Sequence, residues 1–280
     1  MKKWNIYKVL SIILAVVLLV LAAVFVKQKL DQRAEEKALQ EMADGTISYG
    51  DDSAYGDGSA DSAGSSGSSG DADEDAKSHK LDVDIPEKDI DWKELQKENA
   101  DIYAWIYIPG TQVDYPVLQH PKDDTYYLNH CVDGKEGYPG CIYTESINKK
   151  DFSDRNTVLY GHNMKSGSMF GSLRSYRDST FFDENKYCFV YLPNGKVLAY
   201  QLFGAYEWEN THIIDQYRFQ TDAQLQEYLD EVFALRDMNA HFAENVEVTG
   251  KDHILTLSTC VTGTSKRYIV QFVLLNDWNL

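Results

Sequence analysis

The stretch Thr256-Leu257-Ser258-Thr259-Cys260 has the alternation of a β-strand and ends in a cysteine. Apolar and polar side chains alternate along it, as they do in a strand with one buried face. The loop that follows, Val261-Thr262-Gly263-Thr264-Ser265, is polar and leaves the thiol accessible to an incoming peptide. The alternative is a structural thiol, because free cysteine is among the most buried residue types. The sequence therefore offers Cys260 as a candidate nucleophile at a strand end.

Short, β-rich segments surround this strand, and turn residues separate them. Pro193-Asn194-Gly195, for example, is typical of a hairpin turn. Several short strands with few helices predict a mainly β fold, closed or nearly closed into a barrel. The predicted strands are residues 104–108, 114–118, 157–160, 187–192, 196–203, 253–258 and 268–275.

Two helices are predicted within this β-rich part. Asp91 can cap the first, at residues 92–100. The second covers residues 222–237, ahead of the cysteine strand, and begins with the capping-box pattern Thr221-Asp222-Ala223-Gln224. Its apolar side chains recur at helical spacing and predict one buried face.

The N-terminal part carries a predicted membrane anchor at residues 9–26, where Ser11 is the only polar residue. Eighteen residues at 1.5 Å rise cover roughly 27 Å, enough to span a bilayer. No small-x-small cleavage site follows, which favours an uncleaved signal-anchor over a removed signal peptide. Basic residues flank both ends, so the short tail at residues 1–8 is what favours a cytoplasmic N-terminus and an exported C-terminal domain.

Residues 27–79 are predicted to be a disordered linker, charged at first and then acidic and rich in Gly and Ser. Its acidic part would span roughly 30–40 Å and lift a domain at residues 80–280 off the membrane. No Lys or Arg occurs between Lys37 and Lys77, and ten acidic residues there supply most of the formal charge of −17. That charge excludes a nucleic-acid binder, which needs a basic surface.

Two further segments could bring chemistry to Cys260. His162 follows a predicted strand in Leu159-Tyr160-Gly161-His162-Asn163-Met164, and histidine is the usual partner of a cysteine nucleophile. Arg267 begins the next strand, and if the two strands are neighbours its fixed charge could stabilise an oxyanion beside Cys260. The alternatives are a surface or structural histidine, one of seven, and a solvated arginine.

Together, the order His, then T-L-S-T-C, then Arg, on a β-rich domain behind a membrane anchor, resembles the class B sortases. The resemblance covers about residues 92–275 and implies a closed eight-stranded sortase-type β-barrel, with an N-terminal helix and a helix inserted before the cysteine strand. The supporting stretches are Trp105-Ile106-Tyr107-Ile108-Pro109-Gly110-Thr111, Val113-Asp114-Tyr115-Pro116-Val117, Tyr126-Tyr127-Leu128-Asn129-His130 and Tyr160-Gly161-His162-Asn163-Met164.

The resemblance implies a membrane-anchored cysteine transpeptidase on the outside of a Gram-positive cell. Cys260 would attack a threonine carbonyl in the C-terminal sorting signal of a secreted protein, an NPxTx-like or LPxTG-like pentapeptide, and form a thioester. His162 would move the protons and Arg267 would hold the oxyanion. The acceptor would be a peptidoglycan peptide amine or a pilin lysine. Four residues are expected to line the substrate groove: Ser258, Thr259, Leu128 and Asp124.

Two other functions stay open on the sequence alone. One is a cysteine endopeptidase that releases its product to water, and the other is an inactive membrane-tethered binding module with a structural Cys260. No C-x-x-C or H-x-x-x-H pair occurs, so neither a metal site nor a cofactor is predicted.

The remaining cysteines are a separate question. Cys131 and Cys141 stand where the resemblance leads us to expect Asp and Ser or Ala, and they flank a loop rich in turn residues. Outside the membrane they could form a disulfide, if their Cα atoms lie within about 7 Å. Cys188 alternates with apolar neighbours and is predicted to be a buried thiol.

Overall fold

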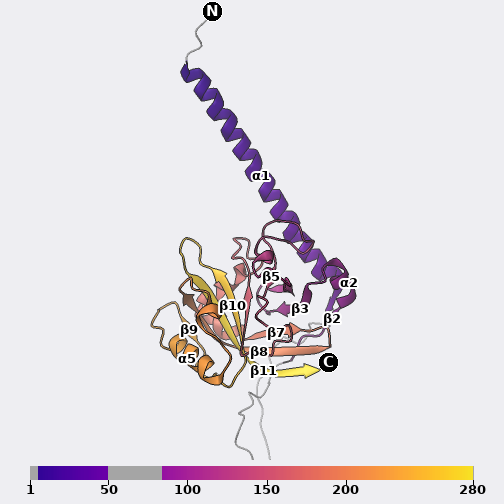
Figure 1. Cartoon of the computed structure of the whole chain (residues 1–280), viewed down its shortest axis with the longest axis vertical. Coiled ribbons are helices and arrows are strands. Elements are labelled where there is room, and N and C mark those ends of the chain that lie inside the picture. The colour runs from indigo at the N-terminus through magenta and orange to yellow at the C-terminus, as the bar shows by residue number, and fades with distance from the viewer. Residues whose placement is uncertain (1–5, 50–83, 280) are drawn as a thin grey trace, which may run out of the picture.

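The structure is a computed structural model, and it describes residues 6–49 and 84–279. The N-terminal part of the long helix α1 projects away from the rest of the molecule, and its C-terminal part lies alongside it (Figure 1). The elements in chain order are α1 (Ile6–Thr46), β1 (Ile47–Tyr49), β2 (Lys88–Ile90), α2 (Trp92–Glu98), β3 (Ile102–Tyr107), β4 (Asp114–Leu118), η1 (Tyr126–Leu128), β5 (Ile142–Tyr143), β6 (Asn156–Tyr160), η2 (Gly171–Arg177), α3 (Ser179–Glu184), β7 (Tyr187–Tyr191), β8 (Lys196–Trp208), α4 (Ile213–Gln216), α5 (Asp222–Phe233), β9 (His241–Phe242), β10 (Ile254–Cys260) and β11 (Arg267–Asn279).

Eight strands form a closed barrel in the order β11-β10-β6-β5-β4-β3-β7-β8, and β8 pairs with β11 to close it. The short strand β9 is added to β8. Most pairs are antiparallel, but β10 lies parallel to β6 and β4 lies parallel to β5. The predicted closed eight-stranded, mainly β fold is confirmed. The β6–β10 pair matters most for function, because it brings together two segments that lie far apart in the sequence.

Strands β10 and β11 of the barrel are buried on both faces. Leu255 and Leu257 of β10 belong to the main core, together with Val270 and Phe272 of β11. The other face of the same strands is covered by α5, whose apolar side chains form a second core with Ile254, Ile269 and Val273. The sequence predicted one buried face for residues 256–260, but the helix covers the second face as well. For this reason the polar residues Thr256 and Ser258 are buried too.

The two predicted helices of the domain are confirmed. Asp91 caps α2 by accepting a hydrogen bond from the Glu94 amide at 3.0 Å. The capping box of α5 is complete, because the Thr221 side chain and the Gln224 side chain each accept from the other's backbone amide. The helix ends at Phe233, earlier than the expected residue 237, and Ala234 is its C-terminal cap.

The N-terminal part differs from the expectation. By length and composition, residues 10–41 of α1 form a helix able to cross a membrane. The first part of the predicted disordered linker, residues 27–46, continues this helix. Good helix formers explain the continuation, as do side-chain pairs one turn apart: Gln32 with Glu36 at 3.2 Å and Lys37 with Glu41 at 2.8 Å. Of the rest of the predicted linker, residues 47–49 form β1, and residues 50–79 lie outside the described residues.

Candidate active site

Cys260 is the last residue of β10 and lies at the surface, although the six residues before it in the strand are buried. Its antiparallel partner in β11 is Arg267. Because directly opposed residues on neighbouring strands point to the same side of a sheet, the register places the guanidinium next to the thiol. The Arg267 Nη1 donates to the Cys260 Sγ at 3.5 Å. The expected proximity of these two residues therefore holds in the structure.

A second contact fixes the orientation of Arg267. Its Nε donates to the Oδ1 of Asn210 at 2.9 Å. Asn210 lies in the loop that follows β8, the strand that pairs with β11 on the side away from β10. With the Nε held by Asn210, the end of the guanidinium is directed to the thiol, so the arginine is positioned rather than freely solvated.

His162 lies in the loop directly after β6, and the parallel β6–β10 pairing brings that loop to Cys260. Two hydrogen bonds extend the pairing beyond the last paired residues. The Thr259 hydroxyl donates to the Gly161 carbonyl at 2.7 Å, and the Asn163 Nδ2 donates to the Cys260 carbonyl at 2.7 Å. The residues on both sides of His162 are thus bound to the end of the cysteine strand. No hydrogen bond joins His162 itself to Cys260 among the residues that the structure describes.

The ring of His162 is held from the opposite direction. Its Nε2 lies 2.8 Å from the Leu128 carbonyl and must donate to it, because a carbonyl only accepts. Nδ1 is therefore the nitrogen that remains to exchange a proton in the neutral ring. The Tyr138 ring packs 4.8 Å from the imidazole. Burial lowers the pKa of His162; the Leu128 carbonyl opposes this, and the charge of Arg267 adds to it.

The four expected groove residues have different environments. Ser258 and Thr259 are only 3% and 1% exposed, so neither offers its side chain to solvent. Thr259 instead holds the histidine loop. Leu128 is 42% exposed, and its carbonyl contacts the ring of His162. Asp124 accepts a hydrogen bond from the Ser146 amide at 2.6 Å and so holds the loop that follows β5. As groove contacts these four stay a prediction.

Sequence reasoning missed a polar cluster beside the site. His212, just before α4, lies 2.5 Å from Glu145, which follows β5, and its other ring nitrogen lies 3.2 Å from Asp215. The Tyr160 hydroxyl lies 3.4 Å from the same imidazole. Burial raises the pKa of Glu145, and His212 opposes that rise. The cluster fixes the loop that carries Asn210, two residues before His212.

The other three cysteines are buried and free. The disulfide expected between Cys131 and Cys141 is not formed in the structure, so for the oxidised protein it stays a prediction. Burial, and next the charge of Glu35, raises the pKa of Cys131 to about 12. Burial also raises the pKa of Cys141 and of Cys188 well above the ordinary value. Cys260 is the one exposed thiol in the part of the chain that the structure describes.

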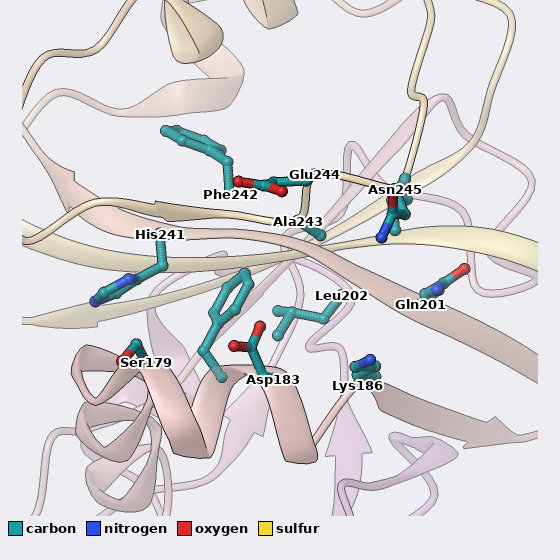
Figure 2. Close-up of a pocket in the computed structure, with 12 residues that line it drawn as sticks. Ser179, Asp183, Lys186, Gln201, Leu202, His241, Phe242, Ala243, Glu244 and Asn245 are labelled. Atoms are coloured by element: carbon teal, nitrogen blue, oxygen red, sulfur yellow. The ribbon is translucent and has the colours of Figure 1, made fainter.

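A cavity of about 390 Å³ lies apart from these residues, between α3, β8 and β9. Figure 2 shows Asp183 and Lys186 on the α3 side, with His241 and Glu244 across from them. None of the predicted site residues lines it. His241 donates through its Nε2 to the Arg177 carbonyl at 3.0 Å, which ties β9 to the end of η2. This cavity therefore contributes nothing to the geometry around Cys260.

The sequence matches known proteins over the region that contains this site. The sequence model of the sortase domain matches residues 106–274. Sortase B of Listeria monocytogenes is 37% identical over 170 residues, which cover 61% of this chain and 67% of that protein. Sortase B of Staphylococcus aureus is 34% identical over 182 residues, covering 64% and 72% respectively.

Solved structures are similar as well. Clostridium perfringens sortase B has a TM-score of 0.59 and 28% identity, with 66% of this chain and 99% of that chain covered. Staphylococcus aureus sortase B in complex with a substrate has a TM-score of 0.57 and 32% identity, with 65% and 83% covered. The residues matched by the sortase-domain model include His162, Cys260 and Arg267.

Proposed function

This chain belongs to the sortase family, in its class B, a group of cysteine transpeptidases that anchor proteins at the cell surface, and we propose that Cys260, His162 and Arg267 carry out its acyl transfer. The observation that supports this most is the 3.5 Å contact between the Arg267 guanidinium and the exposed Cys260 thiol. The thiolate is the reactive form of a cysteine, and Arg267 is a cation in direct contact with this sulfur.

In the first half-reaction the Cys260 thiolate attacks the carbonyl carbon of the threonine in the sorting signal. The oxygen becomes an oxyanion, and Arg267 is the cation close enough to stabilise it. As the C–N bond breaks, protonated His162 gives its proton to the leaving amine, and the acyl group stays on sulfur as a thioester.

In the second half-reaction an acceptor amine attacks the thioester carbon. Neutral His162 takes a proton from that amine, the C–S bond breaks, and Cys260 leaves as the thiolate while a new amide forms. The lowered pKa of His162 suits both steps, since its protonated form gives up the proton readily and its neutral form is available to the second amine.

For the wider setting we propose a single-pass protein with the catalytic domain outside the membrane. The apolar part of α1 supports the anchor. The substrates would be secreted proteins with an NPxTx-like or LPxTG-like signal. The acceptor would be a peptidoglycan amine or a pilin lysine.

The test is product analysis by mass spectrometry. The full chain in detergent is incubated with peptides of both signal types, with and without an amine such as triglycine. A transpeptidase joins the N-terminal fragment to the amine. A fragment that ends only in a free carboxylate, even at high amine concentration, would instead establish a hydrolytic endopeptidase.

Alkylation tests the inactive-module alternative. Cys260 is exposed and the other three thiols are buried, so iodoacetamide should modify Cys260 first and stop product formation in step with modification. A Cys260 that resists the reagent in the folded protein would indicate a structural residue and contradict the proposed role.

A further inference from the structure

The C-terminal part of α1 is bound to the catalytic domain. The Glu36 Oε1 accepts hydrogen bonds from the hydroxyls of Ser166 at 3.0 Å and Ser168 at 2.9 Å. Leu39 is only 7% exposed and belongs to the main core of the domain. The two residues are three apart and therefore lie on one face of the helix. Figure 1 shows this end of α1 alongside the domain and the other end projecting away from it.

The same part of α1 contacts a second loop of the domain. A cavity of about 350 Å³ separates the helix from this loop; Ala34, Glu35, Ala38 and Leu39 line one side, and Cys131, Val132, Asp133 and Gly140 line the other. The Glu35 carboxylate is close enough to the Cys131 thiol for its charge to help raise the pKa of that thiol, after burial. Two sets of contacts, on separate loops, hold a helix more firmly than one and leave it little freedom to pivot.

The strand that follows α1 returns the chain to the domain. β1 pairs with β2, and Tyr49 lies opposite Lys88. Lys88 is buried and its Nζ lies 2.9 Å from a carboxylate oxygen of Asp114 in β4, which fixes β2 to the barrel. Paired strands lie about 5 Å apart, so Tyr49 and Lys88 lie close together although they are far apart in the sequence.

We propose that α1, and not the length of the acidic segment, sets the height and orientation of the catalytic site above the membrane. This rests on the proposed membrane location. Ten residues separate Val26, the end of the apolar run, from Glu36, which corresponds to about 15 Å of helix. The acidic segment connects β1 to β2, and these two strands pair with each other. Its length therefore does not set the distance between α1 and the catalytic domain.

This arrangement differs physically from the tether that composition alone predicted. A free linker would let Cys260 sample a range of heights of about 30–40 Å. A docked helix holds the site at one distance, so that a substrate still attached to the membrane is accepted only if its reach matches that distance. The structure thus assigns to α1 a selection among membrane-bound substrates.

Matched insertions separate the two arrangements. Seven helix-forming residues inserted after Gln28 add two turns, or about 10 Å, and keep the docking face within about 20°. Seven Gly/Ser residues inserted after Gly64 lengthen the acidic segment by the same number. The full chain is reconstituted in vesicles and labelled at Met238→Cys, an exposed site, in a Cys260→Ser background, with an energy-transfer acceptor in the lipid headgroups.

The helix insertion should increase the distance from dye to membrane by about 10 Å, and the segment insertion should leave it unchanged. An increased distance with the segment insertion, or an unchanged one with the helix insertion, would overturn the proposal. Glu36→Ala combined with Leu39→Ala should broaden the distance distribution. Lys37→Ala is the control, because that side chain is exposed and pairs with Glu41.

Two peptides distinguish this inference from the proposed function. With Cys260 restored, a soluble signal peptide should react at the same rate in both insertion variants. A peptide attached to lipid through spacers of graded length should show a longer optimum in the helix variant alone. Distances as expected without any peptide reaction would fault the proposed function and leave the role of α1 intact.

Discussion

One face of the β10–β11 hairpin is buried at one end and exposed at the other. Thr256 and Gln271 are opposed on this face, as are Cys260 and Arg267 at the strand ends. The first pair lies under α5 and is fully buried, whereas Cys260 is exposed. Both pairs are polar and both come from the same alternation. The helix α5 covers one pair and not the other, so the cover that α5 supplies, and not the strand pattern, determines which pair is buried and which is accessible to a substrate.

The buried end has a hydrogen-bond network centred on Gln271. The Gln271 Nε2 donates to the hydroxyls of Thr256 at 2.8 Å and Tyr228 at 2.9 Å, and its Oε1 accepts from Tyr206 at 2.6 Å. The Thr256 hydroxyl in turn donates a hydrogen bond to the Asn156 Oδ1 at 2.7 Å. Both polar groups of the Gln271 side chain form hydrogen bonds within the protein, so neither is available to a ligand. At the exposed end, the thiol has Arg267 as a neighbour and is open to an incoming peptide.

The largest expected effect is that of Cys260→Ala on activity. Without the thiol no thioester can form, so product formation should fall by at least about 10³-fold. The melting temperature should stay within about 2 °C, because the side chain is exposed. Peptide turnover and calorimetry measure the two. A comparable loss of stability would mean that both ends of the hairpin are structural.

The next effect is that of Arg267→Ala, which should lower kcat by about 10²–10³-fold, the range for loss of an oxyanion donor. Arg267→Lys keeps the charge but loses the planar fork that contacts Asn210 and Cys260 together, so it should recover only part of the rate. Asn210→Ala should resemble the lysine variant more than the alanine variant. Full activity in Arg267→Ala would remove the arginine from the mechanism.

Gln271→Ala should show the reverse behaviour. Three hydroxyls lose a partner in a buried site, so the free energy of unfolding should fall by about 2–4 kcal/mol. Turnover per folded molecule should stay within about twofold. Urea denaturation checks this, with the exposed Gln220→Ala as control. A large loss of turnover in protein shown to be folded would join the two ends of the face into one functional unit.

The smallest effect concerns the acid stability of His162. Burial lowers its pKa below the ordinary 6.5, so between these two values the unfolded chain binds more protons than the folded protein. The free energy of unfolding therefore falls as the pH falls through that window. His162→Gln removes this contribution, and its melting temperature should drop less than that of the native protein between pH 7.5 and 5.5, by about 1–2 °C. Parallel curves would show that burial does not affect this imidazole.

The longer strands could be predicted because their signals are local, whereas the roles of Cys260, His162 and Arg267 stay a proposal. Alternation marked β10, a short β-rich run marked β4, and Thr221 and Gln224 marked the start of α5. β5 and β9 have two residues each, which is too short for a periodic signal. The helical continuation of α1 over residues 27–46 was not predicted, because these residues were grouped with the Gly-, Ser- and Asp-rich segment that follows them.

The supporting contacts of the site could not be predicted, since each joins distant parts of the chain. Asn163 binds the carbonyl of a residue 97 positions away, and Asn210 binds a side chain 57 positions away. Asn163 directly follows His162 in the sequence, so its place near the site was predictable, but its hydrogen bond to the end of the cysteine strand was not. No pattern around Asn210 or Glu145 distinguishes them from other polar loop residues.

The parallel pairing of β6 with β10 also has a consequence for when the protein becomes active. The two strands are joined by about a hundred intervening residues, and the barrel is complete only after β11 pairs with β8. Pairings between segments so distant in sequence are slow, because their ordering entropy is lost before their contacts form. A nascent chain that has already made the histidine loop still lacks Cys260 and Arg267. The three residues proposed for catalysis are therefore brought together only when the last strands of the barrel are in place.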